Sequence, residues 1–177
     1  MRAGTLEERL VRPTDIRPIP GGVEVHGSTA PLLIHCSGPF EDIPGMVPVR
    51  GEGLTVHIPG LALRSIVHRG LFLLPIGGST YRAGATFAWD DVWSGPTPEA
   101  REHLLSGLRR LWSDEIQVLD QWTGVRPGSK DRRPVLGRVD EHRAVFSGLG
   151  SRGALLAPWS AAHLAAHLFD GASLDPE

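Results

Sequence analysis

Gln121-Trp-Thr-Gly-Val-Arg-Pro-Gly-Ser-Lys-Asp-Arg-Arg-Pro-Val-Leu-Gly137 is the stretch from which the rest of the sequence is best interpreted. Between Arg126 and Arg138 there are five cations and one anion, Asp131. Because glycine and proline favour turns, and a concentration of positive charge attracts anions, we expect a turn-rich loop that holds an anion. The alternative, that these cations only form a solvated face, stays open. The cations are Arg126, Lys130, Arg132, Arg133 and Arg138, and the turn residues are Gly124, Pro127, Gly128, Pro134 and Gly137.

Composition limits the class of protein. A chain of 177 residues with 41% hydrophobic residues can bury one good core or two small ones. The formal charge of -2 argues against general nucleic-acid binding, and no apolar run is long enough to span a bilayer. The charged N-terminus does not fit a signal peptide, so we expect a soluble, cytoplasmic protein. Cys36 is the single cysteine, which excludes an intrachain disulfide and a thiolate metal cluster.

The first half of the sequence predicts strands. Residues 9–25 predict a hairpin that turns at 20–22, and the apolar run 30–36 predicts a strand buried on both faces of a sheet. Further strands are expected at 47–50, 54–58, 65–69, 71–76 and 80–88. Short connections that contain glycine or proline, among them 51–53, favour an antiparallel sheet.

Two helices are expected in the second half. Thr97 as N-cap and Pro98 at the first helical position predict a helix over 97–112, with leucines at helical spacing. After it, 116–120 and 143–147 predict strands, and 154–169 predicts a helix closed by Gly171. Pro158 bends the early turns of this second helix or marks a reset of its start.

Gly148-Leu-Gly-Ser-Arg-Gly153 has the spacing of a dinucleotide-binding glycine motif. That motif needs a second strand and an acidic residue roughly 20 positions further on, which this sequence does not supply. What remains is a helix N-terminus with free backbone N–H groups, which attracts an anion or an electron-rich ring edge. A plain turn between a strand and a helix is the alternative.

We expect structural roles for the other polar and aromatic residues. His163 and His167 lie on one helix face, but no neighbouring glutamate and no third ligand accompany them, so no metal site is expected. Asp90 and Asp91 fit a polar loop better than an acid/base pair. The tryptophans are expected in the core or at a domain junction: Trp89, Trp93, Trp122 and Trp159.

Two motifs together carry a family resemblance. Residues 123–137, followed by Phe146-Ser-Gly-Leu-Gly-Ser-Arg-Gly-Ala-Leu-Leu-Ala-Pro158, resemble the C-terminal third of FAD-dependent oxidoreductases of the D-amino-acid oxidase and glycine oxidase family. The strand at 32–38, the stretch 48–52 and the strands over 73–90 are similar to other parts of that family. The resemblance covers nearly the whole chain.

The resemblance implies a fold of α+β or α/β class. It implies an antiparallel-sheet substrate domain together with the C-terminal part of a Rossmann-like FAD-binding domain. The expected limits are 1–45 for a partial FAD-binding domain, 46–120 for the substrate domain and 121–177 for the return to the FAD-binding domain. Nothing before Pro31 resembles the family's β-α-β unit. We therefore expect that either a larger parent or a second chain supplies that half.

The resemblance also implies a chemistry and a set of residues. Arg126 is expected to bind the carboxylate of a small amino acid or amine, whose hydride passes to FAD. Ser151 stands where relatives place a second arginine, and Arg152 comes one position later, so the substrate differs from glycine or a simple amino acid. A non-catalytic remnant that binds anions, or a subunit of a split oxidase, is the alternative. The expected FAD-binding residues are Gly38, Gly124, Arg126, Pro127, Gly148, Gly150, Ser151, Arg152, Gly153 and Ala154.

Overall fold

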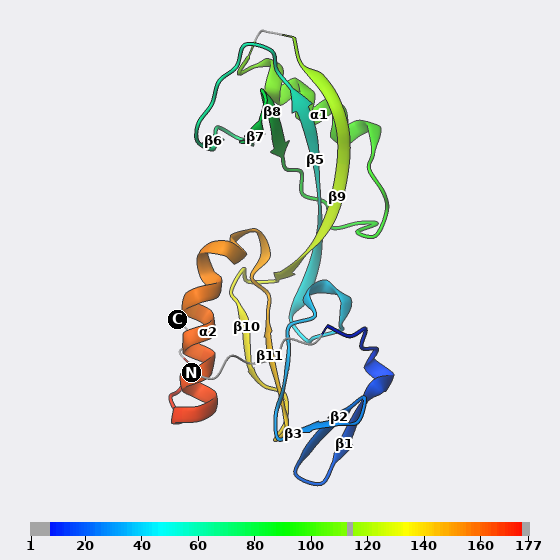
Figure 1. The fold of residues 1–177 in the computed structure, drawn as a ribbon, viewed down its shortest axis with the longest axis vertical. Helices are drawn as coiled ribbons and strands as arrows, with labels where there is room; N and C mark the ends of the chain where they lie inside the picture. The colour runs from blue at the N-terminus through cyan, green and yellow to red at the C-terminus, as the bar shows by residue number, and fades with distance from the viewer. Residues whose placement is uncertain (1–7, 113–114, 175–177) are drawn as a thin grey trace. The chain divides into compact units, whose positions relative to one another are not determined.

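A computed structural model describes residues 8–112 and 115–174, which cluster into two compact units. Figure 1 draws both. The terminal unit comprises residues 8–37, 134–147 and 154–174. The central unit comprises residues 38–112, 115–133 and 148–153.

The central unit is built on a five-stranded sheet. Its strand order is β6-β7-β8-β5-β9, and every neighbouring pair is antiparallel, which confirms the expected antiparallel sheet. The strands are β5 (Met46–His57), β6 (Val67–His68), β7 (Phe72–Gly77), β8 (Thr80–Gly84) and β9 (Gln117–Ser129).

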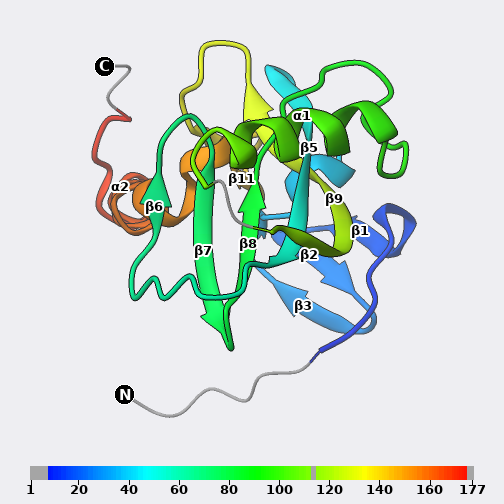
Figure 2. The same cartoon turned by 90° about the horizontal axis from the view of Figure 1, so that it is seen from above.

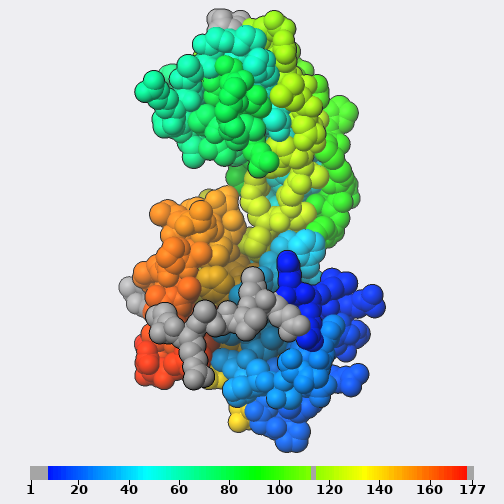
Figure 3. Space-filling model, viewed as in Figure 1, coloured from blue at the N-terminus to red at the C-terminus, as the bar shows by residue number. Residues whose placement is uncertain are grey.

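The two long strands differ from the sequence-based expectation. β5 joins the two short strands expected at 47–50 and 54–58, so the expected connection at 51–53 is wrong. β9 pairs with β5 from Gln117 to Ser129, so most of the expected cationic loop is extended strand. Since β9 lies at the sheet edge, Pro127 can occupy it without removing an interior ladder bond. The yellow-green side chains of β9 run along one visible face of this unit (Figure 3).

Helix α1 (Pro98–Arg109) covers the central sheet (Figure 2) and confirms the helix expected here. Thr97 caps it, because its side chain accepts a hydrogen bond from the Ala100 N–H. Leu104, Leu105 and Leu108 pack against buried residues of β5, β7 and β8, including Leu54 and Leu73. This apolar contact is the larger of the two cores, and each fully buried leucine stabilises it by roughly 1.5–3 kcal/mol.

The terminal unit contains two small sheets and one helix. After η1 (Pro13–Asp15), the hairpin of β1 (Ile16–Ile19) and β2 (Gly22–Val25) confirms the expected turn at 20–22, and β3 (Ser28–Ala30) extends this sheet. The second sheet has the order β10-β11-β4, from β10 (Val135–Arg138), β11 (Arg143–Ser147) and β4 (Leu33–His35). Helix α2 (Gly153–Asp170) packs on this second sheet through Leu164 and Leu168.

Several details of the terminal unit bear on the predictions. β4 pairs in parallel with β11, but it is not buried on both faces as expected, because it is an edge strand and Ile34 is 40% exposed. α2 confirms the second expected helix and ends before Gly171, whose φ is +70°. Pro158 lies inside α2, so the helix does not restart there.

The compact units follow different limits from the expected domains. Residues 38–45 and 121–133, expected with the FAD-binding part, cluster with the central unit. For residues 121–129 the reason is the unbroken pairing of β9 with β5. Among the described residues, no helix is long and apolar enough to cross a membrane.

Candidate functional site

A cavity of about 800 Å³ lies within the central unit. Strands β5 and β9, the segment after β8, the turn after β9 and the glycine turn at 148–152 all contribute to its wall. Its size falls in the usual range of small-molecule and cofactor sites, roughly 300–1,000 Å³. The lining residues are Val47, Val49, Phe87, Trp89, Arg126, Gly128, Ser129, Lys130, Arg132, Gly148, Leu149, Gly150, Ser151 and Arg152.

Arg126 projects from β9 into a space that a glycine leaves open. A Cβ atom on Gly51 of the neighbouring strand would overlap the Arg126 guanidinium. The Arg126 Nη1 donates to the Thr86 carbonyl oxygen at 3.4 Å, and the guanidinium carbon lies 4.8 Å from the centroid of the Phe87 ring. Partial burial lowers the pKa of Arg126 from its usual value, yet an arginine stays charged at neutral pH.

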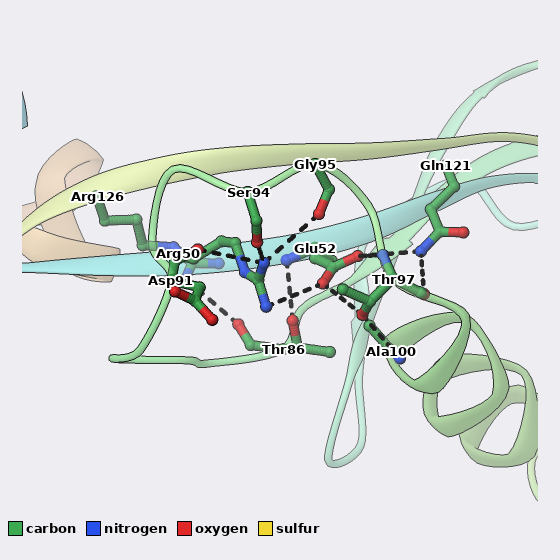
Figure 4. A network of polar contacts seen from close by, with 10 residues as sticks. All are labelled: Arg50, Glu52, Thr86, Asp91, Ser94, Gly95, Thr97, Ala100, Gln121 and Arg126. Atoms are coloured by element: carbon green, nitrogen blue, oxygen red, sulfur yellow. Dashed lines mark hydrogen bonds and ion pairs between the residues drawn. The ribbon is translucent and has the colours of Figure 1, made fainter.

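A buried ion pair lies beside this residue on β5 (Figure 4). Arg50 Nη2 is 3.6 Å from Glu52 Oε1, and the Glu52 side chain is 1% exposed. Glu52 also accepts hydrogen bonds from the Thr97 N–H at 2.8 Å and from the Gln121 Nε2 at 3.0 Å. A buried carboxylate is tolerated only when it is paired and hydrogen-bonded, and Glu52 meets both conditions.

The ion pair ties the segment 86–97 to β5. Arg50 exchanges both backbone hydrogen bonds with Ala88, and its guanidinium donates to the Ser94 hydroxyl group and the Asp91 carbonyl. The Thr86 N–H donates to the Glu52 carbonyl at 3.1 Å. These contacts fix the backbone on either side of Phe87, which in turn lies under Arg126.

The glycine turn forms another part of the wall. Gly148 and Gly150 have φ values of +73° and +55°, a region that glycine adopts far more readily than other residues. A Cβ on Gly150 would lie 3.9 Å from the Gly128 Cα, so the turn approaches the end of β9 closely. The short helix η3 (Gly150–Arg152) then leads into α2, which confirms the expected strand, glycine turn and helix order.

The structure brings together half of the residues expected at the site. Arg126, Gly148, Gly150, Ser151 and Arg152 line the same cavity. The other five are not among its lining residues: Gly38 in η2 (Gly38–Phe40), Gly124 and Pro127 on β9, and Gly153 and Ala154 at the start of α2.

Sequence reasoning missed three contributors. Phe87 and Gly51 surround Arg126, and Glu52 anchors the segment that carries Phe87. Glycine inside a strand often marks a close approach of a neighbouring group, so Gly51 carried a usable signal. The role of Glu52 depends on Thr97 and Gln121, which are distant in sequence and gave no such signal.

The aromatic residues differ from expectation. Trp89, Trp93 and Trp159 are 61%, 59% and 56% exposed, so none of the three lies in a core, and the other expected location, a domain junction, stays a prediction. Trp89 lines the cavity, and Trp93 packs against Phe40 in a tilted arrangement with ring centroids 5.4 Å apart. Trp159 stacks on His163, at 4.9 Å between centroids.

The remaining polar candidates do not line the cavity. His167 Nδ1 lies 2.8 Å from the Ala172 carbonyl oxygen, and the Asp91 carbonyl accepts from Arg50. Asp90 and Asp91 are exposed and do not line the cavity. No group of three potential metal ligands was found among the described residues.

Comparison with known proteins assigns the family. The sequence profile of the family described as FAD dependent oxidoreductase matches residues 8–167. The chain therefore belongs to this family, and the resemblance drawn from its two glycine- and arginine-containing motifs is confirmed. FAD is the cofactor of the family.

Individual relatives show which kinds of protein have similar sequences. The chain is 35% identical over 127 residues to a tRNA 5-methylaminomethyl-2-thiouridine biosynthesis bifunctional protein of Idiomarina loihiensis, covering 68% of this chain and 21% of that protein. It is 31% identical over 116 residues to a glycine oxidase of Bacillus licheniformis, covering 63% and 31%. The crystal structure of glycine oxidase from Geobacillus kaustophilus matches with a TM-score of 0.72 at 25% identity, covering 90% of this chain and 48% of that one. The chain thus spans less than half the length of each of these relatives.

Proposed function

We propose that this chain forms the substrate-binding part of an FAD-dependent oxidoreductase that oxidises a small amine carrying a carboxylate. The observation that carries the proposal is the half-buried Arg126 in the wall of a cavity that also includes the glycine turn. Among the residues that the structure describes, no carboxylate side chain lines that cavity, so the positive charge of Arg126 is available to a ligand.

Arg126 is suited to bind the carboxylate of the substrate. A planar guanidinium holds a carboxylate through two parallel hydrogen bonds, which fixes orientation as well as position. The Phe87 ring and the Thr86 carbonyl restrict the guanidinium before any ligand arrives. Burial strengthens its interaction with an anion, because the surroundings screen charge less than water does.

The residues of the cavity also fit a flavin ring. Phe87 and Trp89 offer aromatic surface, and Gly148 and Gly150 allow close approach of a planar group to the backbone. Cations near such a ring favour negative charge on it. We therefore propose that the glycine turn, through Gly148, Gly150 and Ser151, holds the ring edge, while Arg126 holds the substrate. Flavin supplies the acceptor for the two electrons that leave the substrate carbon.

We further propose that residues outside these 177 bind the pyrophosphate of FAD. Among the described residues, no two parallel strands are joined by a helix in the β-α-β arrangement; the one parallel pair is β4 with β11. The pyrophosphate-binding half would come from the same polypeptide or from a second one. Its identity does not alter the role proposed for Arg126.

Two other functions are kept as alternatives. The match to a tRNA-modification protein favours an amine attached to a nucleoside as a second candidate substrate. The chain could instead be a non-catalytic module that binds anions. Turnover separates this last alternative from the others, because only an enzyme forms a product.

Flavin binding tests the proposal first. The full chain is purified alone and after co-expression with a β-α-β segment of a related oxidase, and its visible absorbance is recorded. We expect flavin bands in at least the second sample. Absence of flavin from both samples would contradict the proposal.

Turnover tests the role of Arg126. In the flavin-loaded protein, Arg126→Ala should lower kcat/KM for amine-dependent peroxide formation by at least about tenfold, since a charge-assisted hydrogen bond contributes roughly 1.5–3 kcal/mol. Arg82→Ala removes an exposed cation that does not line the cavity and serves as the control. Equal rates for the two variants would contradict the role of Arg126.

A further inference from the structure

The cavity carries more positive charge than one carboxylate requires. Besides Arg126, its wall includes Lys130, Arg132 and Arg152, which we call the rim cluster. One guanidinium already suffices for bidentate binding of one carboxylate. The rim cluster is therefore surplus to the function proposed for Arg126.

The acidic residue nearest in sequence does not neutralise this cluster. Asp131 Oδ1 accepts the Arg133 N–H at 3.0 Å, and Asp131 Oδ2 lies 3.9 Å from Arg133 Nε. The Arg133 backbone hydrogen bond is the main reason that the pKa of Asp131 lies below its usual value. In the described part of the chain, none of the ion pairs involves Lys130, Arg132 or Arg152.

Hydrogen bonds hold the two segments of the rim cluster together. Arg132 has a φ of +65°, and its N–H donates to the Ser129 carbonyl at 3.2 Å, which closes a turn. Arg152 Nη2 donates to the Arg132 carbonyl at 3.0 Å and so connects this turn to the glycine turn. Such restraint lowers the entropy lost when a ligand binds.

The rest of the cavity wall also includes apolar side chains. Val47 and Val49 are apolar side chains, which suit a short carbon skeleton rather than a third charge. A ligand with two anionic groups on a short carbon chain matches these residue types.

We propose that the substrate is a small amine with two carboxylates, one bound by Arg126 and the other by the rim cluster. This inference rests on the function proposed above and narrows its substrate class. The rim side chains are exposed, so each contributes less than Arg126, which is half-buried.

Calorimetric titration of the full chain provides the test, because it needs neither flavin nor turnover. The probes are glycine, with one carboxylate, and iminodiacetate, with two. We expect iminodiacetate to bind more tightly than glycine, by up to about fivefold for each exposed ion pair that it forms, since such a pair contributes up to roughly 1 kcal/mol. In the triple variant Lys130→Ala, Arg132→Ala, Arg152→Ala this preference should disappear, while the affinity for glycine should stay the same.

A second triple variant controls for total charge. Arg82→Ala, Arg101→Ala, Arg110→Ala removes the same charge from exposed positions of the central unit outside the cavity, and should keep the preference for iminodiacetate. Equal affinities for both probes in the unaltered chain, or loss of the preference in this control, would overturn the proposal.

A third probe, pyrophosphate, stands in for the FAD phosphates and shows whether the rim cluster binds phosphate instead of a second carboxylate. If the rim variant loses pyrophosphate binding but keeps its preference for iminodiacetate, the proposal is wrong. Arg126→Ala should weaken the binding of both glycine and iminodiacetate. If the substitution leaves the binding of both amines unchanged, the role proposed for Arg126 is wrong, whatever the rim cluster does. If the unaltered chain binds neither amine, both proposals are wrong.

Discussion

Arg126 can be half-buried because Gly51, two positions along β5 from its cross-strand partner Val49, has no side chain. Gly51 pairs with Gly124 across the two strands, and a Cβ on Gly51 would overlap the Arg126 guanidinium. A Cβ on Gly124 would meet no atom within 4 Å. Two glycines that face each other in one sheet therefore have different consequences for the cavity.

Substitution of these two glycines gives a matched test. Gly51→Ala should displace Arg126 and weaken binding of a carboxylate probe about as much as Arg126→Ala does, at least about tenfold. Gly124→Ala should leave binding unchanged. Titration calorimetry measures both affinities, and similar effects from the two substitutions would show that crowding at Gly51 does not control Arg126.

Glu52 supports the cavity from within the sheet. Glu52→Gln removes the charge that faces Arg50 and turns one acceptor into a donor opposite the Thr97 N–H or Gln121. Because a broken buried pair leaves an uncompensated charge, we expect the free energy of unfolding to fall by about 3 kcal/mol. Urea denaturation measures this loss.

Glu102→Gln is the control for this substitution. Glu102 forms an ion pair with Arg109 in which both side chains are more than half exposed, so little change in stability is expected. Equal losses from the two substitutions would mean that the buried network around Glu52 contributes no more than a surface pair.

For individual residues, the sequence could predict the position of Arg126 in the site but not the residues that surround it. The motif that contains Arg126 resembles a family motif, and Arg126 does line the cavity. Phe87 lies beside Arg126 only through the pairing of residues 50–52 with residues 86–88, which are far apart in sequence. Such long-range pairing leaves no periodic signal in either segment.

Among the elements, α1 was predictable and β9 was not. Thr97, Pro98 and the leucine spacing act locally, so they identify the helix without its neighbours. Glycine and proline in β9 favour turns locally, but pairing with β5 along the whole strand outweighs that preference. An edge position, which tolerates proline, cannot be recognised from the sequence of one strand.

The connection between β10 and β11 should respond to acid. Asp140 accepts a hydrogen bond from Arg143 Nε at 2.6 Å and another from the His142 N–H at 2.9 Å, and these contacts lower its pKa from the usual 3.8. Folding favours the ionised form of Asp140. The Asp140 carboxylate therefore contributes to the stability of the fold above pH 3.8, and that contribution is lost as the pH falls through the lowered pKa.

Nuclear magnetic resonance can follow this loss. The His142 amide signal should shift with a midpoint below pH 3.8, and Asp140→Asn should remove that titration. A midpoint at or above 3.8 would contradict the contacts described for Asp140. The matched variant Glu141→Gln changes an exposed neighbour and should leave the titration in place.

For the molecule as a whole, the family assignment and the cavity both support the function proposed above. The family profile covers residues 8–167, while the chain spans less than half of each relative named above. Every residue that lines the cavity belongs to the central unit. Recognition of the substrate carboxylate can therefore be tested on this chain without the remainder of a flavin site.

The most direct measurement is the affinity of the full chain for glycine, compared with that of Arg126→Ala. The substitution should weaken glycine binding at least about tenfold, as expected for loss of a charge-assisted pair. Arg126→Lys keeps the charge but loses the planar pair of donors, so its affinity for glycine should lie between those of the unaltered chain and Arg126→Ala. Equal affinity of the unaltered chain and Arg126→Ala would contradict the claim that Arg126 binds the substrate carboxylate.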